Sequence, residues 1–458
     1  MPRSTRCLVA LAVGLITIAS LPGAQSRVAV NDPVYTQGLQ WALDLIGAPD
    51  AWSRATGRGV TIAVVDSGVD LQHEDLRGKL VGSVSCIGST GSASRCSGSA
   101  QDDNGHGTHV AGIALATTDN GLGVAGVAPD AKLLAVRVLA NHCDAARCTA
   151  SGSQDDVSAG IRWAVDHGAD IVNLSLGSDS PQQALSCSLC SAIDYAWSKG
   201  VIAVLAAGND ARNNQHGLPT SFADEPAVVV TATTRDDSRA SYSSSSAATL
   251  RSARWPVAAP GGEGETDASD CGTNGTPKGV LSSYWVAGAR DQYACLAGTS
   301  MAAPHVAGAL AVLLSQGYEP QGAINQLLAT AKDLGPAGRD DSFGYGRIDL
   351  AKATGATPSP STSRPTIAPT TTPRPPGSTA PLPVSTTKVP DPTSSLVPSP
   401  SIDSPAPLVS LPETSAAAPF QPSDTSSTLP APVVAVAILA LAASGFGAAA
   451  TAWRLARS

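Results

Sequence analysis

Residues 60–68 read Val-Thr-Ile-Ala-Val-Val-Asp-Ser-Gly, a short β-branched run that ends in an acidic residue and a glycine. A run of this length and composition is typical of a parallel strand that is buried on both faces. Similar apolar runs follow at residues 132–138, 171–176, 201–206 and 228–232. Segments with helical patterning lie at residues 107–116, 157–167, 189–199 and 301–315. Strands that alternate with helices predict an α/β fold of three layers, with helices on both faces of a mostly parallel central sheet.

Reactive side chains stand at the ends of three of these segments. Asp66 directly follows the first strand. His106 lies at the start of one helix in Asn104-Gly-His-Gly-Thr-His109, and Ser300 lies at the start of another in Gly298-Thr-Ser-Met-Ala-Ala-Pro304. In open parallel sheets, sites form beyond the carboxyl ends of the strands. We therefore expect these three side chains to meet at one edge of the sheet.

The three residue types suit nucleophilic catalysis. A serine hydroxyl needs a base that takes its proton, and the base needs a third group that holds it in the right tautomer. Ser300, His106 and Asp66 supply those groups. The free N–H of Ser300 at a helix N-terminus can stabilise an oxyanion, and the side-chain amide of Asn209, after Ala206-Ala-Gly, offers a second donor.

Each residue alone has a more ordinary interpretation. An Asp after a strand or a Ser at a helix start is usually a turn or cap residue. The combination, with its flanking glycines, favours the catalytic interpretation. His109 and His305 lie on the same two predicted helices, and we expect them to pack or to orient neighbours because the catalytic role is already filled.

Together the motifs resemble those of the subtilisin-like serine proteases, and most of all the thermitase branch. Four blocks carry the resemblance in the same order along the chain, and it extends over about residues 32–353: Asp66-Ser-Gly68, His106-Gly-Thr-His109, Ala206-Ala-Gly-Asn209 and Gly298–Pro304. It implies a subtilisin-like three-layer α/β fold and a serine endopeptidase that acts through an acyl-enzyme intermediate. In that reaction Ser300 is the nucleophile, His106 the general base and Asp66 the residue that orients the imidazole. Asn209 stabilises the oxyanion.

The resemblance also implies a peptide-binding cleft. Two segments correspond to walls that hold an extended substrate main chain by strand addition: Ser151, Gly152 and Ser153 on one side, and Ser175, Leu176 and Gly177 on the other. Ala206, Ala207 and Gly208 correspond to the floor of the S1 pocket. These residues are small and uncharged, which favours apolar P1 side chains in protein or peptide substrates.

A structural Ca²⁺ site is a further implication of the resemblance. The side chains of Asp32, Asp75 and Asn120 correspond to ligands, and the carbonyl groups of Thr117, Leu122 and Val124 complete the oxygen shell that Ca²⁺ requires. The alternative is that Asp75 and Asn120 are only turn residues.

The two ends of the chain predict export and a membrane anchor. Residues 1–24 combine Arg3 and Arg6 with an apolar run and small residues, the pattern of a secretory signal. Residues 433–452 are uncharged and long enough to span a bilayer, and the arginines in the tail at 453–458 favour a cytoplasmic end. The peptidase domain, residues 25–353, would then be extracytoplasmic on a single-pass membrane protein.

The segment before this apolar run, residues 354–430, consists mostly of Pro, Ser, Thr and Ala. Such a composition predicts a disordered stalk, because little apolar surface is available to offset the entropy of ordering. Leu411-Pro-Glu-Thr-Ser415 within it resembles a sortase signal. A simple transmembrane anchor is favoured, since the final glycine is absent and the apolar run begins too far away.

Cysteine use agrees with an oxidising compartment. Cys7 lies in the predicted signal, and an even number remains, which favours disulfides over metal ligation. Pairing neighbours along the chain gives Cys86–Cys96, Cys143–Cys148, Cys187–Cys190 and Cys271–Cys295, although sequence alone does not fix connectivity. The net charge of −8, without a basic cluster, argues against a nucleic-acid surface.

Alternative functions follow from the same features. Many members of the family that the chain resembles carry an inhibitory folding prodomain, yet only a few residues lie between the predicted signal and Asn31. Either no prodomain is used, or this short arm wraps the domain as in the membrane-anchored mycosins, which would imply a type VII secretion complex as a partner. A non-catalytic surface or secretion-complex protein on a protease scaffold is the main alternative to an enzyme. An esterase or lipase is disfavoured because the nucleophile lacks a Gly-x-Ser-x-Gly elbow.

Overall fold

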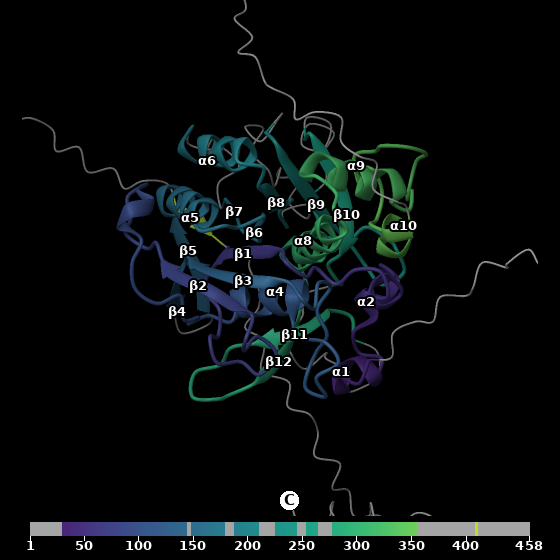
Figure 1. The fold of residues 1–458 in the computed structure, drawn as a ribbon, viewed down its shortest axis with the longest axis horizontal. Helices are drawn as coiled ribbons and strands as arrows, with labels where there is room; N and C mark the ends of the chain where they lie inside the picture. Colours follow the sequence, from purple (N-terminus) through teal and green to yellow (C-terminus); the bar gives the residue numbers. More distant parts are fainter. Residues whose placement is uncertain are drawn as a thin grey trace, which may run out of the picture. The chain divides into compact units, whose positions relative to one another are not determined.

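The computed structural model describes residues 30–143, 148–178, 187–209, 225–244, 253–263, 277–355 and 408–410. Its centre is a seven-stranded sheet in the order β10-β9-β8-β6-β1-β3-β2 (Figure 1). Every neighbouring pair in it runs parallel, which confirms the predicted α/β class with a mostly parallel central sheet. The strands are β1 (Thr61–Asp66), β2 (Leu80–Ser85), β3 (Lys132–Arg137), β6 (Ile171–Leu174), β8 (Ile202–Ala206), β9 (Ala227–Thr233) and β10 (Trp255–Pro260).

Helices cover both faces of this sheet (Figure 1). On one side are α4 (His106–Leu115) and α8 (Thr299–Ser315), and on the other are α5 (Gln154–Asp166) and α6 (Cys187–Ser198). Successive strand residues point to opposite faces, so β1 contributes to two cores. Ile62 and Val64 pack in the core with α4 and α8, whereas Ala63 and Val65 pack in the core with α5 and α6.

Smaller elements surround the three layers. Antiparallel β11 (Val280–Tyr284) and β12 (Gln292–Leu296) form a hairpin that packs against α4. A second small sheet contains β4 (Ala140–Cys143), β5 (Cys148–Ser153) and β7 (Gly177–Ser178). The remaining helices are α1 (Pro33–Thr36), α2 (Trp41–Leu45), α3 (Ala48–Ala51), the 3-10 turn η1 (Ala93–Arg95), α9 (Pro320–Thr330) and α10 (Leu350–Gly355).

The predicted stalk needs two corrections. Helix α10 extends to Gly355, so the first two residues of the predicted stalk, 354 and 355, are helical. Leu408–Ser410, within the stretch predicted to be unfolded, forms strand β13 between β5 and β7. Main-chain pairing on both sides supplies the order that the local composition alone does not provide. Residues 1–24, 433–452 and 453–458 lie outside the described residues, so the signal, the anchor and the tail stay predictions. In the part of the chain that the structure describes, no helix combines the length and apolar character needed to span a bilayer.

The cysteine predictions have mixed outcomes. Cys86 and Cys96 form a disulfide, as expected. Cys143 and Cys295 are also disulfide-bonded, and the side chains of their expected partners lie outside the described residues. The pairing of Cys187 with Cys190 is wrong. Cys190 is not in a disulfide, and its thiol hydrogen-bonds to the carboxylate of Glu225 instead.

Candidate active site

Asp66 and His106 form a buried hydrogen-bonded pair. Asp66 ends β1, His106 begins α4, and Asp66 Oδ1 lies 2.8 Å from His106 Nδ1. The same carboxylate oxygen accepts the N–H of Ser67 at 2.7 Å. With its proton on Nδ1, the imidazole presents Nε2 as an acceptor, and Nε2 has no hydrogen-bond partner among the described residues. This is the arrangement of a general base held in one tautomer.

A glycine lets α4 come this close to β1. A Cβ atom at Gly107 would lie 2.0 Å from the carbonyl oxygen of Gly68 and 3.1 Å from the Cβ of Asp66. The backbone after His106 therefore packs directly on the loop after Asp66. The glycine that follows His106 in the sequence motif has a packing role, since any side chain there would move the histidine.

Asp102 holds the loop that carries His106, and the sequence analysis missed it. This carboxylate is fully buried. It accepts hydrogen bonds from the Ser67 hydroxyl (2.9 Å), the N–H groups of Asn104 and Gly105 (3.0 Å each), and both the N–H (3.0 Å) and the hydroxyl (2.5 Å) of Thr108. Burial raises the pKa of Asp102, while these donors act to lower it. The sequence signal that could have identified Asp102 is an acidic residue four positions before His106.

Ser300 lies in the first turn of α8 and is tied to the end of β6. Its hydroxyl donates to the carbonyl of Ser175 at 3.2 Å, and the Ser175 hydroxyl donates to the carbonyl of Ser300 at 2.8 Å. Asn173 in turn donates to the Ser175 hydroxyl at 2.9 Å. The nucleophile candidate is therefore fixed to the strand next to β1.

The sheet register brings the two halves of the site together. β1 and β6 are neighbours, with Val64 opposite Asn173. Two residues further along each strand, Asp66 and Ser175 leave the same carboxyl edge, and adjacent strands are about 4.8 Å apart. Asp66, which contacts His106, and Ser175, which contacts Ser300, therefore lie at the same edge of the sheet. The Ser300 hydroxyl bonds to Ser175 rather than to His106, so a rotation about χ1 is needed to redirect it toward the imidazole.

Asn209 follows β8 and lies beside the start of α8. Its Oδ1 accepts both the N–H and the hydroxyl of Thr299, each at 2.9 Å. This fixes the orientation of the amide, with Nδ2 as the end that remains to donate. Nδ2 would lie 3.3 Å from a Cβ placed on Gly298. Thr299, which sequence reasoning passed over, therefore aims the amide.

The expected cleft walls lie on the small sheet. Ser151, Gly152 and Ser153 end β5, while Ser175 and Leu176 lead from β6 to Gly177 in β7. β13 lies between β5 and β7 and pairs antiparallel with both. The expected pocket floor, Ala206, Ala207 and Gly208, is buried at the end of β8. The two segments expected as cleft walls therefore flank the same strand, β13.

Comparison with known proteins gives the family. The model of the subtilase family matches residues 57–346. This chain belongs to the subtilase family. Thermitase from Thermoactinomyces vulgaris is 36% identical over 323 residues, which cover 70% of this chain and 98% of thermitase. Subtilisin Savinase from Lederbergia lenta is 36% identical, over 69% of this chain and 99% of its own.

Comparison with a solved structure supports the same family. A protease from Pseudoalteromonas arctica has a TM-score of 0.58 and 31% identity, over 72% of this chain and 100% of that one. The fold is thus the subtilisin-like one, and the predicted resemblance is confirmed. This subtilase is a serine endopeptidase.

The loop at residues 117–124 gathers the residues expected around a cation. Asp32 accepts the N–H groups of Asp119 (2.7 Å) and Asn120 (3.4 Å). Asp75 accepts the N–H of Val124 (3.0 Å) and the Asn120 amide (3.3 Å). Both carboxylates are fully buried, and burial raises their pKa values.

Other contacts complete this loop of the subtilase. The N–H of Thr117 donates to the Asp75 carbonyl at 2.9 Å, and the N–H of Leu122 donates to Asn120 Oδ1 at 2.8 Å. Tyr293, which was not predicted, donates its hydroxyl to Asp75 at 2.9 Å. Among the described residues, no group of three or more His, Cys, Asp and Glu side chains is arranged to hold a metal. The predicted Ca²⁺ ligands consist instead of two carboxylates, one side-chain amide and three backbone carbonyl groups.

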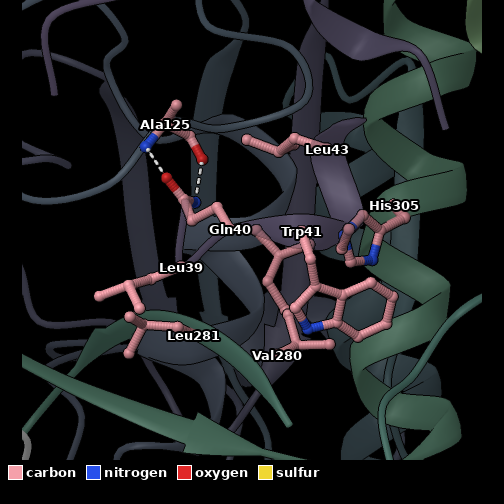
Figure 2. Close-up of a pocket in the computed structure, with 10 residues that line it drawn as sticks. Leu39, Gln40, Trp41, Leu43, Ala125, Val280, Leu281 and His305 are labelled. Carbon is pink, nitrogen blue, oxygen red and sulfur yellow. Dashed lines mark hydrogen bonds between the residues drawn. The ribbon is translucent and has the colours of Figure 1, made fainter. Parts of the chain in front are cut away.

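His109 and His305 are buried, as expected for packing residues. His109 Nε2 lies 3.1 Å and 3.0 Å from the carbonyls of Val280 and Ala294, and burial lowers its pKa to about 3. His305 Nδ1 lies 2.8 Å from the Met301 carbonyl, and burial lowers its pKa to about 4. Figure 2 shows His305 beside Trp41 in an otherwise largely apolar pocket, which no predicted catalytic residue lines.

Proposed function

We propose that this subtilase is an extracytoplasmic endopeptidase that hydrolyses peptide bonds through Asp66, His106 and Ser300, with an acyl-enzyme intermediate. The observation that carries the proposal is the buried 2.8 Å contact between Asp66 and His106 Nδ1, beside a strand that holds Ser300 through Ser175. A buried carboxylate on Nδ1 stabilises the imidazolium that forms when Nε2 takes a proton.

The reaction then follows from these positions. The Ser300 hydroxyl rotates from Ser175 to His106 Nε2, gives up its proton and attacks the substrate carbonyl carbon. His106 passes the proton to the leaving amine. A water molecule, deprotonated by the same histidine, hydrolyses the ester. The developing oxyanion accepts hydrogen bonds from Asn209 Nδ2 and from the Ser300 N–H at the start of α8.

Covalent labelling tests this assignment. A fluorophosphonate probe reacts only with an activated serine, so we expect the wild-type protein to be labelled and the Ser300→Ala variant not to be. Ser315→Ala, which removes a hydroxyl at the other end of α8, is the matched control and should label like the wild type. Wild-type protein that stays unlabelled while its unfolding curve is cooperative would support a non-catalytic scaffold instead.

We also propose that Ca²⁺ binds at the loop of residues 117–124. Two fully buried carboxylates, Asp32 and Asp75, support this, because buried negative charge is costly without a compensating cation. Asp32, Asp75 and Asn120 would supply side-chain oxygens, with the carbonyls of Thr117, Leu122 and Val124. The ion would fix the loop and would take no part in the reaction.

The assignment of the remaining segments rests on sequence alone. We propose a signal at residues 1–24, a peptidase domain at 25–353, a linker at 354–430, an anchor at 433–452 and a cytoplasmic tail at 453–458. The peptidase domain would act outside the cytoplasm on the membrane surface. A type VII secretion complex as partner is supported only by the mycosin-like N-terminal arm. Membrane fractionation of the wild-type chain and of a variant lacking residues 433–458 tests the anchor.

A further inference from the structure

β13 lies between the two segments that the proposed function assigns as walls of the substrate cleft. Residues 408–410 pair antiparallel with residues 151–153 of β5. On the other side, residues 409 and 410 pair antiparallel with residues 177 and 178 of β7. A segment of the chain itself is therefore the strand between the two walls.

The pairing uses main-chain groups on both walls. A β-strand carries N–H and C=O groups along two edges, and a strand between two neighbours uses both of them. A peptide substrate that adds as a strand to β5 or β7 needs the same groups of the same walls. β13 and a substrate therefore exclude each other.

The walls bind through their main chain more than through their side chains. The residues of β5 and β7 that pair with β13 are three serines and two glycines. A Cβ atom added at Gly177 would meet no atom of the described residues within 4 Å. Because small side chains leave main-chain pairing as the main source of affinity, any extended peptide can take the place of β13.

β13 is also short enough to be displaced. It is three residues long, with the β-branched Val409 at its centre. A strand of this length can form only a few ladder hydrogen bonds on each side. The strand and its two walls belong to one chain, so dilution of the protein does not lower the local concentration of β13.

We propose that β13 is a built-in competitive inhibitor of this subtilase, an inference that rests on the proposed function of the groove between β5 and β7. While β13 is paired with both walls, a peptide substrate is excluded, and a bound substrate displaces β13. If β13 fills the groove in about 90% of the molecules, about a tenth of them are open, and the apparent KM is about tenfold higher. Saturating substrate keeps β13 displaced, so kcat is unaffected.

A proline at the centre of β13 tests this proposal in the full-length chain. Val409→Pro removes a main-chain N–H and disfavours a strand between two neighbours. We expect its KM for a short peptide to be about tenfold lower than that of the wild type, with the same kcat. Val384→Pro, in the same Pro-rich tract but outside β13, is the matched control and should keep the KM of the wild type. A KM of Val409→Pro within twofold of the control would overturn the proposal.

Dilution and intact mass distinguish inhibition within one chain from two other causes. The ratio of the two KM values should stay constant over a hundredfold range of enzyme concentration. A ratio that grows with enzyme concentration would show that the strand comes from a second copy, and it would overturn inhibition within one chain. The wild type should also retain residues 408–410 during the assay. Their loss in a Ser300-dependent cut would show that β13 is a substrate and not an inhibitor.

The two proposals fail in different ways. If neither the wild type nor Val409→Pro hydrolyses the peptide, the proposed endopeptidase activity is wrong. If hydrolysis depends on Ser300 while Val409→Pro and Val384→Pro have equal KM values, the endopeptidase activity stands and only the inhibitory role of β13 is wrong.

Discussion

At the scale of single residues, the orientation of one amide determines whether the site can stabilise charge. An asparagine donates through Nδ2 and accepts through Oδ1, and only the donor end helps an oxyanion. Thr299 fixes the orientation of the Asn209 amide, because its N–H and its hydroxyl both donate to Asn209 Oδ1. Thr299 therefore positions the amide of Asn209, and in the proposed reaction this would aim the Nδ2 donor at the oxyanion.

Replacing the donor tests this role. We expect Asn209→Ala to lower kcat by on the order of 10²–10³ with little change in KM, because the hydrogen bond is made mainly in the transition state. Thr299→Val keeps the N–H but removes the hydroxyl, and we expect a loss of about tenfold, the size of one hydrogen bond. Asn325→Ala, on the exposed side of α9, is the control. A peptide-hydrolysis assay that finds equal kcat values for Asn209→Ala and the control contradicts the assignment.

The sequence motifs led to Asp66, His106, Ser300 and Asn209 because each stands at a recognisable strand or helix end. Asp102 and Thr299 have no such signature. Their importance comes from hydrogen bonds to residues that only the fold brings near, such as Ser67 to Asp102 and Asn209 to Thr299. Motif reasoning finds residues with chemistry of their own more readily than residues that position them.

At the scale of elements, the start of α4 depends on the absence of a side chain. Gly107 has ordinary helical geometry, so the constraint is steric: the space that a Cβ would need is filled by the loop after β1. The distance between Asp66 and His106 is set by how closely helix and strand approach, and the contact at Gly107 determines that approach.

We expect Gly107→Ala to push α4 away from β1 and to lower kcat/KM at least 10²-fold, since a shift of about 1 Å in a catalytic group has that cost. The matched control is Gly322→Ala in α9. Its added Cβ would meet nothing closer than 3.7 Å, and alanine favours the helix. Steady-state kinetics together with a melting curve checks both variants. Full activity in folded Gly107→Ala would show that the close approach of α4 to β1 is not required for activity.

The strands that sequence predicted correctly are the ones buried on both faces. Every residue of β8 and β9 is buried, and apart from the two threonines of β9 their side chains are all apolar. β2 was missed because it lies at the sheet edge, with exposed Leu80 and Val81 and a glycine in the middle. The hairpin of β11 and β12 was also missed, because its strands pair with each other across residues 285–291 and carry no long apolar run.

At the scale of the whole molecule, a cation at the 117–124 loop would link it to the N-terminal segment through Asp32. With Ca²⁺ at about 100 times its dissociation constant, binding adds about 2.7 kcal/mol to the free energy of unfolding. We expect a chelator to lower Tm by roughly 5 °C or more. In Asp75→Asn the chelator should have no effect, whereas Asp50→Asn, exposed on α3, should respond like the wild type. Equal Tm values for the wild type with and without chelator would refute the site.

The buried histidines make the stability of the domain depend on pH. The pKa values of His109 and His305 are lowered to about 3 and about 4, while an unfolded chain takes up these protons near pH 6.5. Between about pH 4 and 6.5 the unfolded state therefore binds more protons, so stability falls as the pH decreases through this window. Each histidine contributes up to about 1.4 kcal/mol per pH unit.

Urea unfolding at pH 5 and pH 7, in the Ser300→Ala background to prevent autolysis, measures this effect. We expect His305→Gln to be less sensitive to pH than its parent, because one proton fewer is taken up on unfolding. His142→Gln, at an exposed position, should keep the full pH dependence. If both variants show the same pH dependence of stability as the Ser300→Ala parent, buried His305 is not a source of that dependence.

The last helix of the domain determines how the molecule responds to mechanical load. α10 is six residues long. Its Leu350 N–H donates to the Ile46 carbonyl at 2.7 Å. Its Ala353 and Thr354 carbonyls accept hydrogen bonds from the side chains of Gln326 and Gln316 at 3.0 and 3.1 Å. A pull from the C-terminal side would load the pairing of β13 with β5 and β7 first. Once β13 has detached, α10 would peel away before any strand of the parallel sheet, lengthening the chain while the sheet and the residues at its carboxyl edge keep their shape.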